Sequence, residues 1–374
     1  MKIAYVTKTP WGENSPGFIF SYFQAKGIAE NNLNVTLFMK TAQSIYKGQR
    51  RIDQNPLPNL KVKLFKGSLS FLNANEIFYH RVQKYILHNK FDIVFTRDPG
   101  FLPYLYKIKK KLNNKTFYQS HNFYMDFNLH EYTQSNQRKK FHNYEKKYIS
   151  NLNALMTLNH PQKKLYEKYV KIPVESCHPG LHPKKSSFGN FKNRNIIYSG
   201  SFQKLKGIEE IISLWEKTKL KKGVLSLIGG RNMKELNYVF SLVDKSIAKN
   251  INVKGWMEYS SLMHEMKNAS IGLIILPNQF YNQYLTAPSK LYDFISCGLP
   301  VICTYLPSTK DLIPENHKGV KFVKPGDTLG YINAIKKFSE NKKEYEDAQQ
   351  SNIDLSSQIT WAKMTKSMIK MFKK

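Results

Sequence analysis

The stretch Leu285–Thr304, LTAPSKLYDFISCGLPVICT, places a hydroxyl, an amine and a carboxylate near the start of an expected helix. Pro288 suits a helix start, because its ring fixes φ and it lacks an N–H that would be unpaired there. Ser289 and Lys290 then fall in the first turn of the expected helix. Asp293 follows one turn later, and its carboxylate can accept two hydroxyl groups of the kind a ribose presents.

A structural interpretation of this stretch is a well-capped crossover helix that leads into the strand VICT. It accounts for Pro288 and for Gly298, which is typical of the residue just after a helix end. It does not account for a serine, a lysine and a carboxylate at this spacing. We therefore expect the front of this helix to hold a ligand.

A second candidate for anion binding is the stretch YSGSFQKLKGIEE at residues 198–210. A strand is expected to end at Gly200, small and polar residues turn the chain, and Lys206 precedes a helix that starts at Gly207. A lysine beside the positive end of a helix suits a diphosphate. The alternative is a surface lysine before an N-terminal glycine.

Two features of the N-terminal half fall at expected strand ends. The loop TPWGENSPG at residues 9–17 could present backbone N–H groups to an anion, although it lacks the G-x-G-x-x-G pattern and could be an ordinary connection. His121 directly follows another expected strand, which places it at the rim of a ligand-binding cleft. A single histidine is more often structural than catalytic, so its position is the argument for function.

The elements that must position these residues alternate between short apolar strands and helical patterns, as in α/β folds with parallel sheets. The pattern runs once through the first half of the chain and then restarts. Strands are expected at 2–7, 34–39, 91–97, 115–121 and 154–159, and then at 193–201, 223–230, 250–256, 270–276, 301–304 and 319–327. A loop followed by a helix is expected at 13–32. Further helices are expected at 73–89, 101–112 and 137–151, and then at 207–218, 232–248, 259–268, 329–348 and 357–373.

This repeat predicts two Rossmann-like domains that face each other across a cleft at the carboxyl ends of their strands. The first is expected at residues 1–180 together with a closing helix at about 357–374, and the second at 190–350. The segment 177–193 is rich in Pro, Gly, Ser and Asn, as linkers are. A length of 374 residues also favours two domains over one.

The charge balance is strongly basic, with 58 Lys and Arg residues against 27 Asp and Glu and a net charge of +31. Residues 1–190 carry a net charge of +19 and residues 191–374 a net charge of +12. A basic face attracts lipid headgroups, nucleic acid or a phosphorylated substrate, and it can also be merely solvated. The sequence has no helix-turn-helix, aromatic RNA-binding or zinc-binding motif that would support nucleic-acid binding. We therefore favour an anionic membrane surface or a lipid-phosphate substrate as the partner of the basic face.

Other sequence features argue against a membrane-spanning, secreted or metal-binding protein. The chain has no apolar run long enough for a transmembrane helix, and its first residues read as a strand rather than a signal peptide. The three cysteines lack metal-binding spacing, so we expect free thiols in a reducing cytoplasm. An acidic D-x-D pair for a divalent ion is also missing from the sequence.

Taken in order, these motifs resemble the GT-B glycosyltransferases of family 4, the glycosyl transferases group 1, over nearly the whole chain. The resemblance rests on TFYQSHN, GLHP, IIYSGSFQKLKGIEEII, LSLIGG, NVKGWMEYSSLMHEMKNASIGLII, PSKLYDFISCGLPVICT, GVKFVKPGD and ITWAKMTKSMIKMF. It implies a GT-B fold whose C-terminal helix crosses back to the first domain. It also implies a retaining, metal-independent transfer of sugar from a nucleotide-sugar, with no other cofactor.

The resemblance assigns roles to individual residues. Lys206 matches the residue that binds the donor's pyrophosphate, and Asp293 matches the second acid of an E-x7-E signature, which holds the ribose. The chain departs from the family at Ser201, where many members have Arg, and at Leu285, where the first acid would stand. The expected catalytic residues are His121, Lys206 and Asp293. The expected residues of the acceptor-side loop are Gly12, Ser15 and Gly17. The expected donor-binding residues are Gly200, Ser201, Lys204, Lys206, Gly230, Trp256, Met257, Pro288, Ser289, Lys290, Leu291 and Asp293.

The two departures suggest substitutes and alternatives. Lys204 or Gln203 could take the place of the missing Arg. Gln283 or Thr286 could replace the missing acid, or the backbone N–H groups around Ala287–Ser289 could bind the sugar alone. The expected function is transfer to a glycan or lipid-linked saccharide in bacterial surface polysaccharide assembly, by a cytoplasmic protein peripheral to the inner membrane face. The alternatives are a GT-B nucleotide-sugar epimerase, a glycogen-synthase-like polymerase, or a non-catalytic member that binds nucleotide-sugar.

Overall fold

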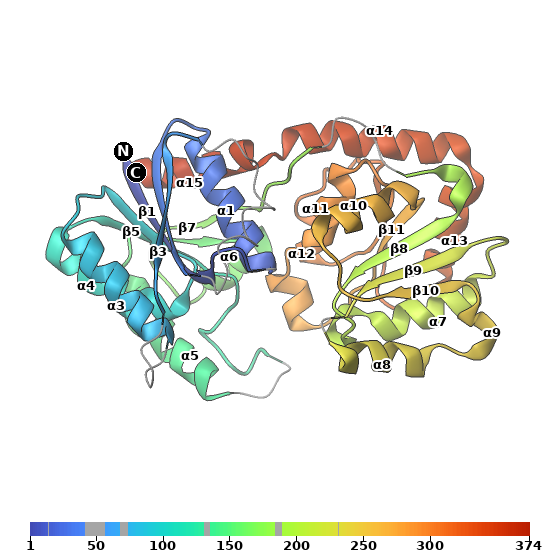
Figure 1. Ribbon diagram of the computed structural model, residues 1–374, viewed down its shortest axis with the longest axis horizontal. Helices are drawn as coiled ribbons and strands as arrows, with labels where there is room; N and C mark the ends of the chain where they lie inside the picture. The colour runs from blue at the N-terminus through green and yellow to red at the C-terminus, as the bar shows by residue number, and fades with distance from the viewer. Residues whose placement is uncertain (14, 42–56, 68–73, 131–134, 184–188, 231) are drawn as a thin grey trace. The chain divides into compact units, whose positions relative to one another are not determined.

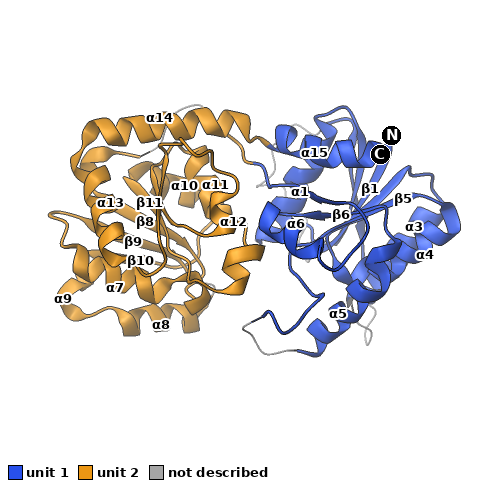
Figure 2. Ribbon diagram, turned by 180° about the vertical axis from the view of Figure 1, so that it is seen from behind, with its two compact units in different colours: residues 1–180, 361–374 blue, residues 181–360 orange. Residues whose placement is uncertain are grey.

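The computed structural model describes residues 1–13, 15–41, 57–67, 74–130, 135–183, 189–230 and 232–374 (Figure 1). Its chain forms two compact units. Unit 1 comprises Met1–Gly180 and Trp361–Lys374, and unit 2 comprises Leu181–Thr360 (Figure 2). The linker predicted at 177–193 includes residues 184–188, which lie outside the described part of the chain.

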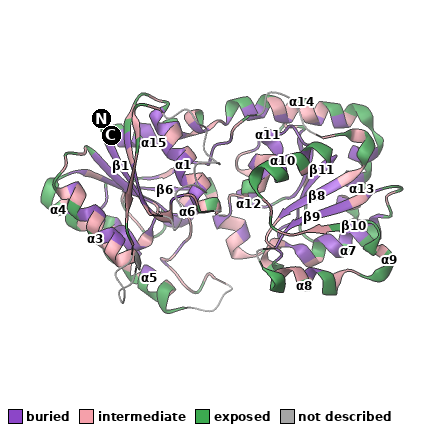
Figure 3. Ribbon diagram, in the orientation of Figure 1, coloured by how far each residue is buried: buried purple, intermediate pink, exposed green. Residues whose placement is uncertain are grey.

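Unit 1 is built on a parallel sheet of seven strands in the order β3-β2-β1-β4-β5-β6-β7. The inner strands are apolar almost throughout because helices cover both faces of the sheet, and Figure 3 shows them buried. The strands are β1 (Lys2–Pro10), β2 (Asn34–Lys40), β3 (Leu60–Phe65), β4 (Ile93–Thr96), β5 (Lys115–Gln119), β6 (Ala154–Thr157) and β7 (Val174–Ser176). The helices are α1 (Pro16–Ala29), α3 (Ala74–Leu87), α4 (Leu102–Leu112), α5 (Asn136–Tyr148), α6 (His160–Tyr166) and α15 (Trp361–Lys373).

The C-terminal helix α15 belongs to unit 1, where it packs beside α1 (Figure 1). Asn31, just beyond α1, donates through Nδ2 to the Ala362 carbonyl oxygen at 2.8 Å. The apolar face of α15, including Met368 and Phe372, completes the core formed by α1 and the inner strands. The chain therefore returns to its first domain at its end, as the resemblance implied.

Unit 2 is built on a parallel sheet of six strands in the order β10-β9-β8-β11-β12-β13. The strands are β8 (Asn195–Gly200), β9 (Val224–Gly229), β10 (Ile251–Lys254), β11 (Ile271–Ile274), β12 (Val301–Thr304) and β13 (Val320–Val323). The helices are α7 (Ile208–Thr218), α8 (Met233–Leu242), α9 (Lys245–Ala248), α10 (Tyr259–Asn268), α11 (Ser289–Ser296), α12 (Pro307–Lys310), α13 (Thr328–Glu340) and α14 (Lys342–Gln358), and a π-helix spans Tyr281–Leu285. Both units are thus Rossmann-like, as expected from the sequence.

Several predicted elements differ in detail from the structure. The helix predicted at 232–248 is divided into α8 and α9, because the Asp244 side chain accepts the Ser246 N–H and caps a new helix. The helix predicted at 329–348 is divided in the same way at Asn341, whose side chain caps α14. The strands β3 and β7 and the π-helix were not predicted.

Each sheet reverses its strand order once, between β1 and β4 in unit 1 and between β8 and β11 in unit 2. In open α/β sheets, ligands bind beyond the carboxyl ends of the strands at such a reversal. In unit 1 this point is flanked by the loop after β1 and by the residues that follow β4 and β5. In unit 2 it is flanked by the loop after β8 and by the segment between β11 and α11.

Candidate functional site

Arg97, the first residue after β4, joins the parts of the candidate site in unit 1. Its Nη2 donates to His121 Nδ1 at 3.0 Å, and its Nη1 lies 3.3 Å from the Gly17 carbonyl oxygen and 3.2 Å from Ser21 Oγ. The guanidinium carbon also lies 4.8 Å from the centre of the Phe20 ring. One side chain thereby connects the start of α1 with the predicted catalytic histidine.

His121 lies two residues beyond β5 in an enclosed environment. The Phe20 ring meets the imidazole edge to face, with centroids 4.6 Å apart, and Trp361 packs on Phe20 at 5.2 Å. Burial, and secondarily the charge of Arg97, lowers the pKa of His121 well below its usual value. The imidazole is therefore neutral at physiological pH. Its Nε2 is shielded from solvent and no described residue forms a hydrogen bond with it.

The loop that carries His121 is anchored by a buried acid, Glu145 on α5. The hydroxyls of Tyr118 and Tyr166 donate to Glu145 Oε1 at 3.0 and 2.9 Å, and the Tyr124 N–H donates to Oε2 at 3.0 Å. The Tyr166 hydroxyl also lies 2.8 Å from Ser120 Oγ. Burial raises the pKa of Glu145 to about 8, although these hydrogen bonds oppose the shift. The network fixes the backbone on both sides of His121.

Three further side chains bind carbonyl groups of the same loop. Gln162 Nε2 donates to the Asn122 carbonyl oxygen at 2.9 Å. His130 and His142 hydrogen-bond to the carbonyl oxygens of Phe123 and Tyr124. The loop is therefore held by side chains of α5 and α6 and by His130 from the same connecting segment, and a preorganised site needs such support.

The predicted acceptor-side loop connects β1 to α1. Ser15 is the N-cap of α1 and its Oγ accepts the Phe18 N–H at 3.3 Å, while Ser15 Oγ donates to Glu13 Oε2 at 3.0 Å. Gly12 lies in the turn between β1 and the helix. Of the three predicted loop residues, only Gly17 contacts Arg97, through its carbonyl group.

In unit 2, the loop after β8 is packed tightly against the neighbouring strand end. Gly207 ends the short turn Lys204–Lys206 and starts α7 with a φ of 73°. A Cβ atom at this position would lie 2.1 Å from the Ile275 carbonyl oxygen. Only glycine fits here, and the close approach fixes the Lys206 turn beside the carboxyl end of β11.

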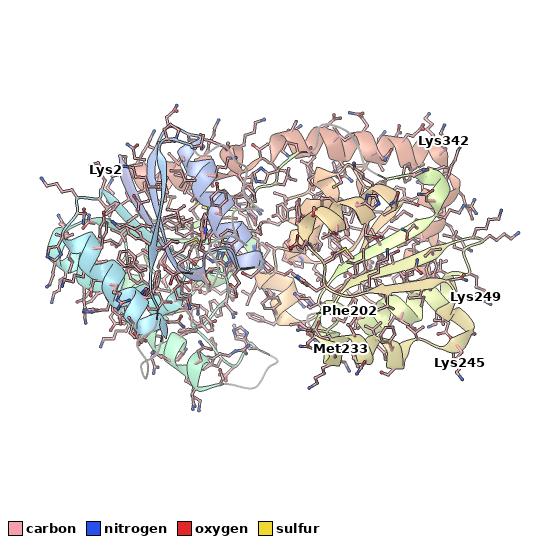
Figure 4. All side chains as sticks on the ribbon, viewed as in Figure 1. Lys2, Phe202, Met233, Lys245, Lys249 and Lys342 are labelled. Atoms are coloured by element: carbon pink, nitrogen blue, oxygen red, sulfur yellow. The ribbon has the colours of Figure 1, made fainter. Side chains whose placement is uncertain are left out.

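Glu235, in the first turn of α8, holds the other side of this loop. Its carboxylate accepts the Phe202 N–H at 2.9 Å and the Gln203 side-chain amide at 3.1 Å. Figure 4 labels Phe202 together with Met233, the first residue of α8. Gly230, after β9, lies against the Phe202 ring. The loop backbone is thus fixed by protein contacts, although a carboxylate occupies one of the N–H groups that an anion could have used.

Lys206 is held by the π-helix Tyr281–Leu285. Its Nζ lies 5.0 Å from the centre of the Tyr281 ring. Asn282, which is fully buried, donates through Nδ2 to the Leu205 carbonyl oxygen at 3.2 Å and to the Pro277 carbonyl oxygen at 3.0 Å. The π-helix therefore positions the turn that carries the predicted pyrophosphate ligand. Sequence reasoning gave Tyr281 and Asn282 no role.

Lys290 and Asp293 pair with each other at the start of α11. Lys290 Nζ lies 2.9 Å from Asp293 Oδ2, and both side chains are partly exposed. Pro288 is the N-cap of this helix and Ser289 is its first, exposed residue. The helix ends as predicted, with Gly298 in the left-handed region at a φ of 67°.

The other residues considered for the donor site differ in how far their side chains are exposed to solvent. Leu285 and Leu291 are each only 1% exposed and serve the core, so Leu291 could contribute only its backbone to a ligand. Gln283 Nε2 donates to Asn278 Oδ1 at 2.7 Å, and Thr286 is buried. Trp256 is exposed and Met257 is half-buried, and both follow β10.

The structure therefore brings some predicted residues together and not others. His121 and Gly17 meet through Arg97, Lys290 meets Asp293, and Ser201 and Lys204 share the loop of Lys206. Ser201 is partly exposed, and Lys204 Nζ lies 3.7 Å from Glu209. Sequence reasoning missed Arg97, Glu145, Tyr281 and Asn282.

The fold is that of the GT-B glycosyltransferases. Similar solved structures include sucrose-phosphate synthase from Thermosynechococcus elongatus, at 12% identity and a TM-score of 0.75, which covers 100% of this chain and 98% of that one. Anabaena HepE in complex with UDP and glucose is similar at 9% identity and a TM-score of 0.74, with 100% and 99% covered. A mutant of S. aureus TarM in complex with fondaparinux, alpha-GlcNAc-glycerol and UDP is similar at 11% identity and a TM-score of 0.74, with both chains fully covered.

Residues 183–354 match the family described as glycosyl transferases group 1. Unit 2 therefore carries a domain of this family, and the protein is a glycosyltransferase. No curated protein matches the sequence. Within the part of the chain that the structure describes, no helix is both long and apolar enough to cross a membrane.

Proposed function

We propose that the protein transfers a sugar from a nucleotide-sugar to a hydroxyl of a glycan or lipid-linked saccharide, with retention of the anomeric configuration. The observation that carries the proposal is the pair Lys290–Asp293 at the start of α11, within the group 1 domain. The pair provides a cation for a diphosphate and a carboxylate for ribose hydroxyls. Lys206 provides a second cation from the loop after β8.

The chemistry of this step is mainly electrostatic. As the bond between the sugar and the diphosphate breaks, negative charge builds on the leaving diphosphate. Lys206, Lys290 and the N–H groups at the start of α11 would stabilise that charge, and preorganised groups of this kind can contribute several kcal/mol. No metal ion or other cofactor takes part in the proposed reaction.

The donor can be identified by thermal-shift screening against UDP-, GDP-, ADP- and dTDP-sugars. The solved complexes of HepE with UDP-glucose and of TarM with UDP make UDP-sugars the first to test. A ligand present at about 100 times its Kd should add ~2.7 kcal/mol to the free energy of unfolding. Labelled donor incubated without acceptor then separates a transferase from an epimerase, which would return an epimerised nucleotide-sugar.

We further propose that unit 1 docks on an anionic membrane surface, where a lipid-linked acceptor would be found, and that the pathway is bacterial surface polysaccharide assembly. The support is a group of exposed lysines on α4 and α5, two helices in contact with each other, where the centres of the Tyr106 and Tyr148 rings lie 5.5 Å apart. Each basic side chain near such a surface contributes ~1 kcal/mol. The lysines are Lys107, Lys110, Lys111, Lys146 and Lys147.

Sedimentation with liposomes tests this proposal. The protein should sediment with liposomes that contain anionic lipid at low salt and should be released at high salt. Changing the five lysines to glutamine should weaken sedimentation, whereas five such changes among exposed lysines of unit 2 should not. Equal binding to neutral liposomes would contradict the electrostatic account.

A further inference from the structure

The contacts of Arg97 leave its guanidinium little freedom. It donates to Gly17, Ser21 and His121, and it lies over the Phe20 ring. Three of these partners belong to the first turns of α1, and the fourth belongs to the loop after β5. A planar guanidinium can satisfy such divergent acceptors while stacking on an aromatic face, whereas a lysine ammonium cannot.

The contact between Arg97 and His121 decides where the imidazole carries its proton. A guanidinium has N–H donors and no acceptor, and it keeps its charge in proteins. His121 Nδ1, at 3.0 Å from Arg97 Nη2, must therefore accept, so it carries no hydrogen. A neutral imidazole whose Nδ1 is an acceptor carries its hydrogen on Nε2.

The resulting Nε2–H group is a hydrogen-bond donor without an acceptor among the described residues. Nε2 is shielded from solvent and no described residue forms a hydrogen bond with it. A buried donor without a partner is unfavourable, so a ligand oxygen that accepts this hydrogen bond is favoured. His121 stands at the carboxyl end of β5, next to the strand β4 that flanks the reversal of strand order.

We propose that Arg97 is a positioning residue that fixes His121 as the neutral Nε2–H tautomer, so that His121 donates a hydrogen bond to an oxygen of the bound sugar. In this form His121 is a hydrogen-bond donor and not a proton-accepting base. The identity of the ligand as a sugar rests on the proposed function. The tautomer and its dependence on Arg97 do not.

The tautomer can be measured by NMR on protein with nitrogen-15 in its histidine rings. The chain has ten histidines, and the signals lost in His121→Gln identify those of residue 121. At neutral pH, we expect a proton on Nε2 and a proton-free, hydrogen-bonded Nδ1. Arg97→Gln should release Nδ1 and give a mixture of tautomers, and Arg97→Lys should not restore the wild-type signals.

Arg81→Gln is the matched control, because Arg81 lies in the same unit and its Nη1 donates to the carbonyl group of the exposed residue Lys66. It should leave the His121 signals unchanged. A proton on Nδ1 in the wild-type protein would overturn the proposal even if Arg97→Gln did not fold. Wild-type signals in a folded Arg97→Gln variant would overturn it as well.

Measurements of kcat distinguish whether His121 acts as a hydrogen-bond donor or as a base. The amide nitrogen of glutamine can reach the place of imidazole Nε2, whereas that of asparagine is too short. His121→Gln should therefore retain roughly 10-fold more kcat than His121→Asn, as expected for one oriented hydrogen bond. Equal loss in both would contradict the role as donor. Absence of any transferase activity would instead contradict the proposed function and leave the NMR result standing.

Discussion

Lys290 and Asp293 form an ion pair of 2.9 Å across the first turn of α11, and their side chains are 28% and 22% exposed. The two groups that were expected to bind different parts of a nucleotide thus contact each other. A ligand that offers a phosphate to Lys290 and a diol to Asp293 could exchange one set of polar contacts for another.

Asp293→Asn and Lys290→Met should therefore weaken donor binding more than they weaken the fold. A partly exposed pair contributes at most ~1 kcal/mol to stability, whereas a charged hydrogen bond to a ligand is worth roughly 1.5–3 kcal/mol. We expect about a 10- to 100-fold rise in the donor Kd by calorimetry. Asp347→Asn, in the exposed pair Lys318–Asp347 of the same unit, is the control and should leave that Kd unchanged.

Gly207→Ala should destabilise unit 2 strongly. The new Cβ would meet the Ile275 carbonyl oxygen at 2.1 Å in addition to the cost of a positive φ. Gly326 has a similar φ of 80° but nothing within 4 Å of its Cβ position, so Gly326→Ala has only the backbone cost, about 1 kcal/mol. Denaturant unfolding should give a clearly larger loss for Gly207→Ala. Equal losses would show that the loop can move away from β11.

Glu145 should make the stability of unit 1 depend on pH. Its pKa is about 8 in the folded protein, above the ordinary value of 4.5, so the folded state binds a proton that the unfolded state has lost. The contribution of Glu145 to the free energy of unfolding is fully present below pH 4.5 and decreases as pH rises toward 8. The difference in unfolding free energy between wild type and Glu145→Gln should therefore change over this range. A difference that is constant with pH would contradict the assignment, and Glu167→Gln, at an exposed position, should show none of the effect.

Removal of divalent ions should leave transfer unaffected. The proposed stabilisation of the leaving diphosphate comes from Lys206, Lys290 and helix N–H groups. Initial rates with excess EDTA should equal those with added Mg²⁺ or Mn²⁺. A rate that falls with EDTA and recovers with one of these ions would show that a cation shares the charge.

Much of this arrangement follows from the sequence, because strands, helices and the ends between them leave local signals. The alternation of apolar runs predicted both sheets, and the strand-end rule selected His121 and the loop of Lys206. The same rule applied to Arg97, directly after the apolar strand IVFT, would have found the residue that holds His121. Its importance depends on acceptors 24 and 80 residues away, which no local pattern shows.

Other features escape prediction for different reasons. The strand β3 is an edge strand with lysines at alternate positions, LKVKLF, so its apolar signal is weak. The π-helix Tyr281–Leu285 has no established sequence signature, yet it determines the setting of Lys206. Leu285 was recognised as a departure from the family, and its burial shows that it serves the core rather than a ligand.

The most direct test of the account is calorimetric titration of the nucleotide-sugar selected by screening into wild type, Lys206→Met and Lys217→Met. Lys206 is held beside the strand reversal of unit 2, and Lys217 lies in the last turn of α7. We predict one binding site in the wild type, a roughly 10- to 100-fold weaker Kd in Lys206→Met, and no change in Lys217→Met. The same affinity in all three proteins, or no binding of any nucleotide-sugar by the wild type, would contradict the account.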